Sequence, residues 1–326
     1  MRIVGAILLL LLFAPTWSGE ERLPLYSGTP TVLARRVPLF PDDPDRTRLG
    51  ALTYLGGLQL RSRDPAFGGF SSLAVNGGNF TLLSDGGLVF HFRMGGDLVP
   101  HAPAFAALPA GPRTGWRKMD RDSESLTTDP ATGRMWVGFE NANAIWRYAP
   151  DFARGEASAR PRRMRRWPKN SGPESMVRLT DGRFLVLSED ADAPGGGQRA
   201  LCFDRDPTDP AARRWNFVFR APGRYLPSDM AQVDARHLLV LVRDATLREG
   251  FTNLLLLVDL ASIKPGATVR GRVLARLAWP TLHDNFEGVA VTHEGGRPIV
   301  WLVSDDNTPS WFQRTLLLKF RLDAAL

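Results

Sequence analysis

Acidic side chains stand at both ends of an apolar, strand-like segment in the middle of the chain. Residues 171–190, SGPESMVRLTDGRFLVLSED, carry Glu174 near one end and Glu189 near the other. A Thr-Asp-Gly-Arg turn divides the segment into two predicted antiparallel strands, and reflection through Asp181 and Gly182 places Glu174 opposite Glu189. Carboxylates held this close can bind a cation, and they repel each other unless a cation or a basic side chain compensates.

The same hairpin design recurs four more times along the chain. Each copy has a polar or charged residue at the start of its first strand and another at the end of its second strand, around a turn that contains glycine or aspartate. The four further pairs found by reflection are Ser71 with Asp85, Glu124 with Glu140, Ser228 with Arg243, and Glu287 with Asp305. The recurrence indicates that these positions share one structural role.

These hairpins repeat at a regular interval. The first-strand positions 71, 124, 174, 228 and 287 are separated by 53, 50, 54 and 59 residues, and such a period is typical of propeller blades. A third strand-like run follows each hairpin, for example LVFHFRM or TLLLKFRL, and a fourth follows where the spacing allows. Four strands per unit and few helix-length periodic segments predict an all-β chain folded as a single β-propeller.

The two ends of the repeat region predict how the ring closes. After the last hairpin, TLLLKFRLDAAL leaves its blade one strand short, whereas LTYLGGLQLRS precedes the first hairpin in the place of a fourth strand. We therefore expect an N-terminal strand to complete the C-terminal blade and to remove two exposed edges. Five repeats are counted, and a sixth blade built from residues 24–66 stays open because TVLARRVPLF has no assigned strand.

The propeller geometry predicts where the acids gather. The first strand of each blade lines the channel and the second runs antiparallel beside it, so the start of the first and the end of the second meet at one mouth. The acids expected there are Asp85, Glu124, Glu140, Glu174, Glu189, Glu287 and Asp305, followed by Asp306. So many oxygen ligands favour a hard divalent cation, Ca²⁺ before Mg²⁺. The alternative is structural, with acids that accept hydrogen bonds from the backbone of the next blade.

Two basic side chains near these acids have chemical uses. Arg243 stands where the other hairpins have an acid or its equivalent, and it either neutralises two neighbouring carboxylates or presents a fork to a phosphate oxygen. His283 lies four residues before Glu287, where it is a candidate acid or base. The sequence contains no G-x-S-x-G nucleophile elbow, no H-E-x-x-H zinc motif and no phosphate-binding P-loop.

The N-terminal segment predicts export. Residues 1–21, MRIVGAILLLLLFAPTWSGEE, have the layout of a secretory signal peptide, and we assign residues 1–19 to the signal and 20–326 to the propeller domain. The apolar run is about half as long as a membrane-spanning helix requires. We expect a periplasmic or secreted monomer that has no stable membrane span after signal removal. Cys202 is the only cysteine, so an intramolecular disulfide is excluded.

The charge balance points to anionic ligands. The net charge is +7, which attracts phosphates and other anions without specifying which. The densest basic run, RPRRMRRWPK at residues 160–169, is either a solvated loop between structural units or an anion site. Export and the lack of zinc-finger, RNA-binding or helix-turn-helix signatures argue against nucleic acid as a partner. A small anionic or phosphate-ester substrate is the expected partner.

The ordered set of hairpin motifs resembles a known family. GGFSSLAV…LLSDGG, DSESL…GFE, GPESM…DGRFLVLSED, PSDMA…LLVLVRD and DNFEGVAV…WLVSDDN are similar to the bacterial phytase-like propeller family, described as carrying esterase-like activity of phytase. The similarity runs in order from about Gly56 to Phe320. It implies an exported propeller with phosphoesterase chemistry, and it transfers the metal and catalytic site onto Glu124, Glu174, Glu287, Asp305 and Asp306. Ser71 and Ser228 depart from the acidic pattern.

Two functions follow as hypotheses. As an enzyme, the protein would hydrolyse a phosphate ester with a divalent cation, Ca²⁺ first, that polarises the ester and activates water. Its candidate catalytic residues are Glu287, Asp305, Arg243 and His283, and the sequence does not separate phosphate esters from lactones or carboxylic esters. As a binding module, a non-catalytic periplasmic propeller would hold a ligand or protein partner, and its acids would only link the blades.

Overall fold

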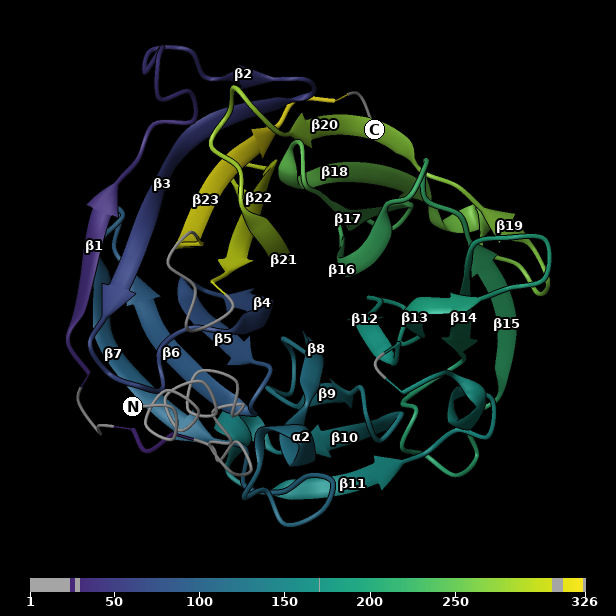
Figure 1. Ribbon diagram of the computed structural model, residues 1–326. Helices are drawn as coiled ribbons and strands as arrows, with labels where there is room; N and C mark the ends of the chain where they lie inside the picture. The colour runs from purple at the N-terminus through teal and green to yellow at the C-terminus, as the bar shows by residue number, and fades with distance from the viewer. Residues whose placement is uncertain (1–23, 27–29, 170, 307–312, 325–326) are drawn as a thin grey trace, which may run out of the picture.

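The computed structural model describes residues 24–26, 30–169, 171–306 and 313–324. Its strands form five separate sheets arranged as blades around a central channel, as Figure 1 shows. The predicted all-β propeller is confirmed, whereas the predicted signal peptide falls outside the described residues. No helix in the described ranges is long and apolar enough to cross a bilayer. The short helical turns are α2 (Lys118–Arg121), η1 (Pro150–Phe152), η2 (Met164–Arg166) and η3 (Leu260–Ser262).

The first four blades follow the chain order from the channel outward. Blade 1 contains β4 (Phe70–Asn76), β5 (Asn79–Ser84), β6 (Leu88–Met94) and β7 (Pro100–Ala107). Blade 2 contains β8 (Ser123–Thr128), β9 (Met135–Phe139), β10 (Ala144–Tyr148) and β11 (Gly155–Ala159). Blade 3 contains β12 (Pro173–Arg178), β13 (Phe184–Asp192), β14 (Gln198–Phe203) and β15 (Arg214–Phe219), and the short β19 (Thr268–Val269), which comes later in the chain, pairs in parallel with β15 at the outer edge. Blade 4 contains β16 (Leu226–Gln232), β17 (His237–Thr246), β18 (Gly250–Asp259) and β20 (Arg272–Leu277).

The fifth blade joins the two ends of the chain. It contains β21 (Asn285–Glu294), β22 (Arg297–Asp305), β23 (Thr315–Leu322), β3 (Leu52–Ser62) and β1 (Val32–Arg36), and β2 (Arg48–Leu49) pairs with β3. β3 is antiparallel to β23, so the predicted closure by an N-terminal strand is confirmed. The segment TVLARRVPLF supplies β1 at the outer edge of this blade. The count is therefore five blades, and residues 24–66 extend the fifth rather than build a sixth.

Alternating side chains on the inner strands bury both faces of each blade. In β17, Leu239 and Leu241 pack into a core shared with blade 5, whereas Leu238, Val240 and Val242 pack into a core shared with blade 3. Because successive residues of a strand point to opposite faces, a continuous apolar run is needed where both faces are covered. This requirement explains why the second strand of each repeat is strongly apolar in the sequence.

One buried acid in the channel wall links blades that are far apart in the sequence. Asp229 on β16 accepts a hydrogen bond from the backbone amide of Val289 on β21 at 2.9 Å and one from the Ser72 hydroxyl on β4 at 3.3 Å. The Ser72 oxygen accepts a further bond from the amide of Leu126 on β8. The side chain of Asp229 is 1% exposed, and burial raises the pKa of its carboxyl well above the ordinary value. Asp229 therefore has the structural role proposed for acids at blade contacts.

Replacing Asp229 with alanine should destabilise the ring without touching the channel mouth. We expect a loss of about 2 kcal/mol of unfolding free energy, because the buried Val289 amide and Ser72 hydroxyl lose their acceptor. Urea unfolding of the variant and the wild type measures this difference in free energy. The control is Asp209→Ala, whose exposed carboxylate accepts one bond from the nearby amide of Ala211. Equal stability of the two variants would contradict the linking role.

Candidate active site

A β-bulge lies at the same place in every blade, and in three of the blades the side chain of the bulged residue lines the channel mouth. Each hairpin has one residue of its first strand without a partner on the second strand, and an extra residue of this kind bends the strand and redirects its side chain. The five bulged residues are Ser71, Glu124, Glu174, Ser228 and Glu287. They are the positions that mark the sequence repeat.

The bulges correct the predicted pairing of the acids. Pro173 pairs with Ser188 and Ser175 pairs with Leu187, so Glu174 is the extra residue and does not face Glu189 directly. The other four predicted pairs are wrong for the same reason. Reflection through the turn assumes that both strands contribute the same number of residues, and the bulge adds one residue to the first strand. For example, Asp305 on β22 pairs with Asn285 on β21 and not with Glu287.

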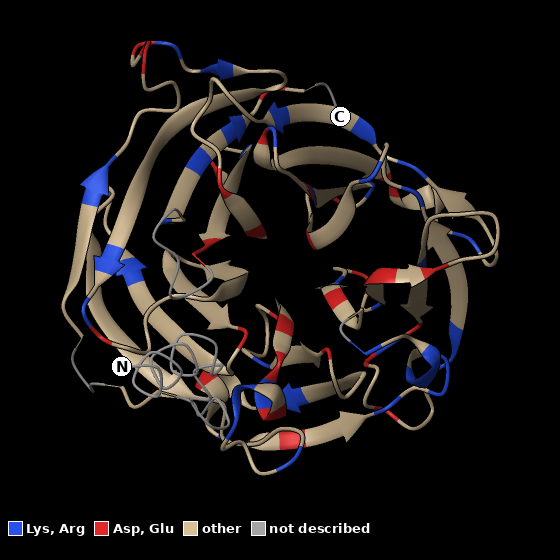
Figure 2. Cartoon of the chain, viewed as in Figure 1, with Lys and Arg blue, Asp and Glu red and all other residues tan. Residues whose placement is uncertain are grey.

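The side chains at the mouth surround a cavity of about 470 Å³. Its lining carboxylates are Asp85, Asp122, Glu124, Glu140, Glu174, Glu189, Glu287 and Asp305. All seven acids that the sequence placed at the mouth are among them, and Asp122 is an addition. Lys118 and Arg243 are the two cations of the lining, which also includes Met119 and Asn141. In Figure 2, acidic segments border the central channel, whereas many basic segments lie toward the rim of the ring.

Two groups of three carboxylates are close enough to share a cation. Asp122, Glu124 and Glu140 form one group, and Glu140, Glu174 and Glu189 form the other, with one ligand oxygen from each residue within 4.8 Å of the others in its group. Glu140 belongs to both groups. All of these donors are oxygens, so the set fits a hard cation such as Ca²⁺ and does not fit a site built for a thiolate-preferring metal.

Burial and mutual repulsion raise the pKa of several of these carboxyls. Burial, followed by the negative charge of Asp122, raises the pKa of Glu140 to about 8. Burial and the charge of Glu189 raise the pKa of Glu174 well above its ordinary value, and burial and the charge of Glu174 do the same for Glu124. At neutral pH, such groups retain protons unless a cation compensates them. A positive charge at this site would therefore stabilise the ionised form of these carboxyls.

Arg243 supplies one positive charge to these carboxylates. Its guanidinium donates to Glu287 Oε1 at 2.6 Å and to Glu189 Oε1 at 2.8 Å, and it lies 3.7 Å from Glu174 Oε1. Asn285 adds a bond from its amide nitrogen to the same Glu287 oxygen at 2.7 Å. The charge of Glu287 is the main cause that raises the pKa of Arg243 above its usual range. Of the two roles predicted for Arg243, this geometry matches neutralisation of carboxylates.

Lys118 is the other cation at the mouth, and the sequence analysis missed it. Lys118 Nζ lies 2.6 Å from Asp85 Oδ2, and its side chain is 36% exposed compared with 24% for Arg243. It lies on the short helix α2, directly before Asp122 and Glu124. The sequence did contain a signal for Asp122. It lies two residues before the bulged Glu124, and Asn285 lies at the same distance before the bulged Glu287. Lys118 had none, because no equivalent residue recurs in the other blades.

Two predicted site residues do not line the cavity. Asp306 accepts hydrogen bonds from the amide of Gly69 at 3.0 Å and from the Thr315 hydroxyl at 2.9 Å, and it thereby connects blade 5 to the start of blade 1. His283 has its Nδ1 2.7 Å from the Thr281 carbonyl oxygen and is absent from the cavity lining. Of the remaining predicted residues, Glu124, Glu174, Glu287, Asp305 and Arg243 come together in the cavity.

The profile of one protein family matches most of the chain. It is the phytase-like family, described as esterase-like activity of phytase, and it matches residues 65–308. The chain belongs to this family. The matched span begins just before β4, includes every residue that lines the mouth cavity and ends just after β22. The resemblance inferred from the hairpin motifs is therefore confirmed for the family.

Solved structures with similar folds are propellers of low identity. An exo-1,5-α-L-arabinanase from a bovine ruminal metagenomic library is 12% identical, with 78% of this chain and 93% of that chain covered and a TM-score of 0.42. A putative 6-phosphogluconolactonase from Bacteroides uniformis is 14% identical, with 81% and 79% covered and a TM-score of 0.39. The WD40 domain of Neurospora crassa Pan2 is 8% identical, with 79% and 90% covered and a TM-score of 0.39. Likeness at this level carries no argument about function. No curated protein matches the sequence.

Proposed function

We propose that this protein is an exported, metal-dependent phosphoesterase that acts at the acidic mouth of its channel. The observation that carries the proposal is the pair of carboxylate groups that share Glu140 in a cavity with eight acids and two cations. Membership of a family described by esterase-like activity of phytase supports hydrolysis of an ester bond. A phosphate ester would be repelled by the acids alone, so the proposal requires a bound cation. We expect a monomer in the periplasm or outside the cell.

The residues proposed to hold the cation are those of the two carboxylate groups. Asp122, Glu124, Glu140, Glu174 and Glu189 offer enough oxygens for the six to eight ligands that Ca²⁺ takes when water completes the set. When bound, a divalent cation neutralises phosphate oxygens and lowers the pKa of a water ligand. Glu287 and Asp305 line the same cavity and remain candidates for positioning water or substrate.

The chain's own side chains would divide the remaining work. Arg243 and Asn285 both bond Glu287 Oε1, so they fix this carboxylate and leave Oε2 as the oxygen to accept a proton from water. Lys118 is the more exposed cation, so its ammonium group is better placed than Arg243 to bind a phosphate oxygen. Met119, which is 61% exposed, would offer an apolar contact at the same rim.

Removal of the cation or of its shared ligand tests the proposal. We expect turnover of a generic phosphomonoester or phosphodiester to fall below about one hundredth when EDTA is added, and to return with Ca²⁺. Glu140→Gln should cause a comparable loss because both carboxylate groups contain this residue. The matched control is Asp181→Asn, at the opposite end of the β12–β13 hairpin, where the carboxylate pairs with Arg183. This control should keep full turnover.

The outcomes separate the two functions that the sequence left open. Cation binding with no turnover of phosphate, lactone or carboxylic esters would favour the non-catalytic binding propeller. Turnover that survives both EDTA and Glu140→Gln would contradict the metal-dependent site. Metal content of the purified protein and a Ca²⁺-dependent shift of the melting temperature, measured on the same samples, show whether a lost activity reflects a lost ion.

A further inference from the structure

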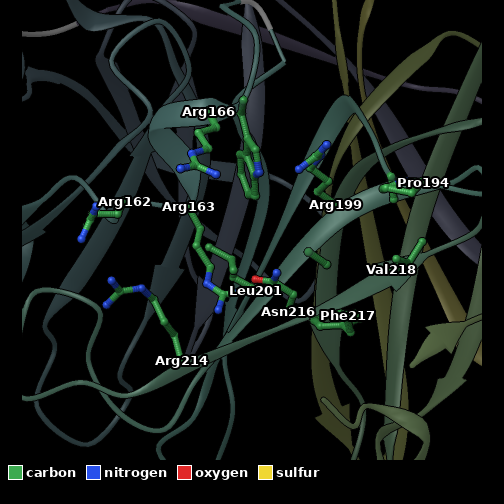
Figure 3. A pocket seen from close by; sticks show the side chains of 13 residues that line it. Arg162, Arg163, Arg166, Pro194, Arg199, Leu201, Arg214, Asn216, Phe217 and Val218 are labelled. Carbon is green, nitrogen blue, oxygen red and sulfur yellow. The ribbon is translucent and has the colours of Figure 1, made fainter. Parts of the chain in front are cut away.

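A second cavity, of about 510 Å³, lies on the outer half of blade 3. Its walls come from the loop between β11 and β12, from β14 and from β15, and Figure 3 shows its side chains. We call it the arginine pocket, because five of its lining residues are Arg162, Arg163, Arg166, Arg199 and Arg214. Three of these arginines belong to the basic run at residues 160–169 that the sequence left as either a loop or an anion site.

The strand register explains why these side chains gather. Leu201 on β14 pairs with Asn216 on β15, and Arg199 pairs with Val218. Alternate residues of paired strands point to one face of a sheet, so Arg199, Leu201 and Asn216 face the same side. Leu201 belongs to the core that blade 3 shares with Trp136 of blade 2. The pocket therefore opens beside the seam between blades 2 and 3.

The loop that covers this seam is anchored and not simply solvated. Met164 is 0% exposed and Trp167 is 5% exposed, and both pack in the same core as Leu201. The arginines between and around these two anchors are exposed. The anchors fix the loop backbone, so Arg163 and Arg166 project from a defined 3-10 turn toward the face of blade 3.

The five guanidinium groups lack acidic partners in the part of the chain that the structure describes. Ion pairs join Arg147, Arg183 and Arg243 to carboxylates elsewhere, but none involves an arginine of this pocket. Figure 3 shows the five labelled arginine side chains spread around the pocket. Five positive charges around one hollow repel each other, and an anion of several charges relieves that repulsion.

We propose that the arginine pocket binds a small ligand that carries two or more phosphate groups. Guanidinium forks match phosphate oxygens in geometry and charge, and the cavity volume lies in the range of small-molecule sites. Leu201 and Val218, which lie on the same face of the blade as Arg199, add an apolar wall, and this suits a ligand with an organic part. This proposal is independent of the acidic mouth, because none of its residues lines that cavity.

Calorimetric titration of the full chain in EDTA with inorganic tripolyphosphate tests the pocket directly. EDTA keeps divalent cations from carrying phosphate to the acidic mouth. We expect saturable binding that the double variant Arg163→Gln, Arg199→Gln weakens about tenfold or more. The matched control, Arg248→Gln with Arg270→Gln, removes two exposed arginines outside the pocket and should change the affinity by less than about twofold. Equal melting temperatures show that each variant folds.

Two results would overturn the proposal, and a third would support it. Equal weakening by both double variants would show unspecific attraction to the net charge and overturn it. Binding to phosphatidylglycerol vesicles with no binding of tripolyphosphate would assign the arginines to a membrane surface and also overturn it. Arg163→Lys with Arg199→Lys keeps the charge and removes the fork, so an affinity between that of the wild type and that of the glutamine variant supports fork recognition.

Discussion

Replacing Arg243 with methionine is expected to lower the free energy of unfolding by about 3–5 kcal/mol at pH 8 without divalent cations. The guanidinium group contacts Glu287 at 2.6 Å, Glu189 at 2.8 Å and Glu174 at 3.7 Å. Methionine fills a similar volume but leaves these three acids without their shared cation. The loss therefore measures unpaired charge more than lost packing. Urea unfolding of the two proteins in EDTA gives the value.

The same substitution at a surface arginine is the control. Arg276 pairs with Glu249 at 2.8 Å, and both side chains are about half exposed, so Arg276→Met should cost less than about 1 kcal/mol. At pH 5, protonation of the mouth carboxyls should reduce the loss caused by Arg243→Met, because fewer negative charges then lack a partner. A loss that is equal at pH 5 and pH 8 would refute the electrostatic explanation.

The cation-free protein is expected to become less stable as the pH rises from 6.5 to 8.5. The raised pKa of Glu140, about 8 compared with an ordinary 4.5, means that the folded chain holds a proton that the unfolded chain has released. Stability falls with pH wherever the folded state binds more protons. The expected slope is about 1.4 kcal/mol per pH unit for each carboxyl that stays protonated. Glu124 and Glu174, whose pKa values burial and neighbouring carboxylates also raise well above the ordinary value, add to this slope.

The lower limit of this range avoids an opposite effect. Burial lowers the pKa of His91 from its ordinary 6.5, so the folded chain holds this imidazole neutral and gains stability as the pH rises toward 6.5. Urea titrations in EDTA at several pH values measure the slope. Glu140→Gln should reduce it, whereas Glu156→Gln, at a surface ion-pair cluster, should not. Saturating Ca²⁺ should reduce the slope of unfolding free energy against pH, because the cation would take the place of the protons. An unchanged slope in Ca²⁺ would argue against a cation at these acids.

The blade pattern could be predicted because each repeat contains the same short-range sequence features. Glycine-rich turns, such as Gly77 and Gly78 with φ values of 55° and 83°, and apolar second strands recur at one spacing. Closure by β3 was also predictable, since the last repeat lacks a strand and the first is preceded by one. The place of β1 was not, because a strand at the outer edge of a completed blade has no repeat partner to reveal it.

The site could be predicted as a set of acids but not as a geometry. The bulges at Glu124, Glu174 and Glu287 depend on how each inner strand bends between its neighbours, and counting residues around a turn cannot detect them. His283 was proposed from its nearness in sequence to Glu287, yet it does not line the cavity. Lys118 enters from a helix outside the repeat, so the repeat gave no position for it. Such local departures from a repeat are the features that three-dimensional packing decides.

The closure of the fifth blade has a consequence for how the chain reaches its folded state. β3 is synthesised early, but its partner β23 follows only after residues 63–314 have been made. Until then, β3 has an unpaired edge toward the place that β23 will occupy. Contacts across so long a separation form slowly, and exposed edges promote association between chains during the delay. The yield of folded protein should therefore fall as the chain concentration rises, and as the time between the synthesis of β3 and its pairing with β23 increases.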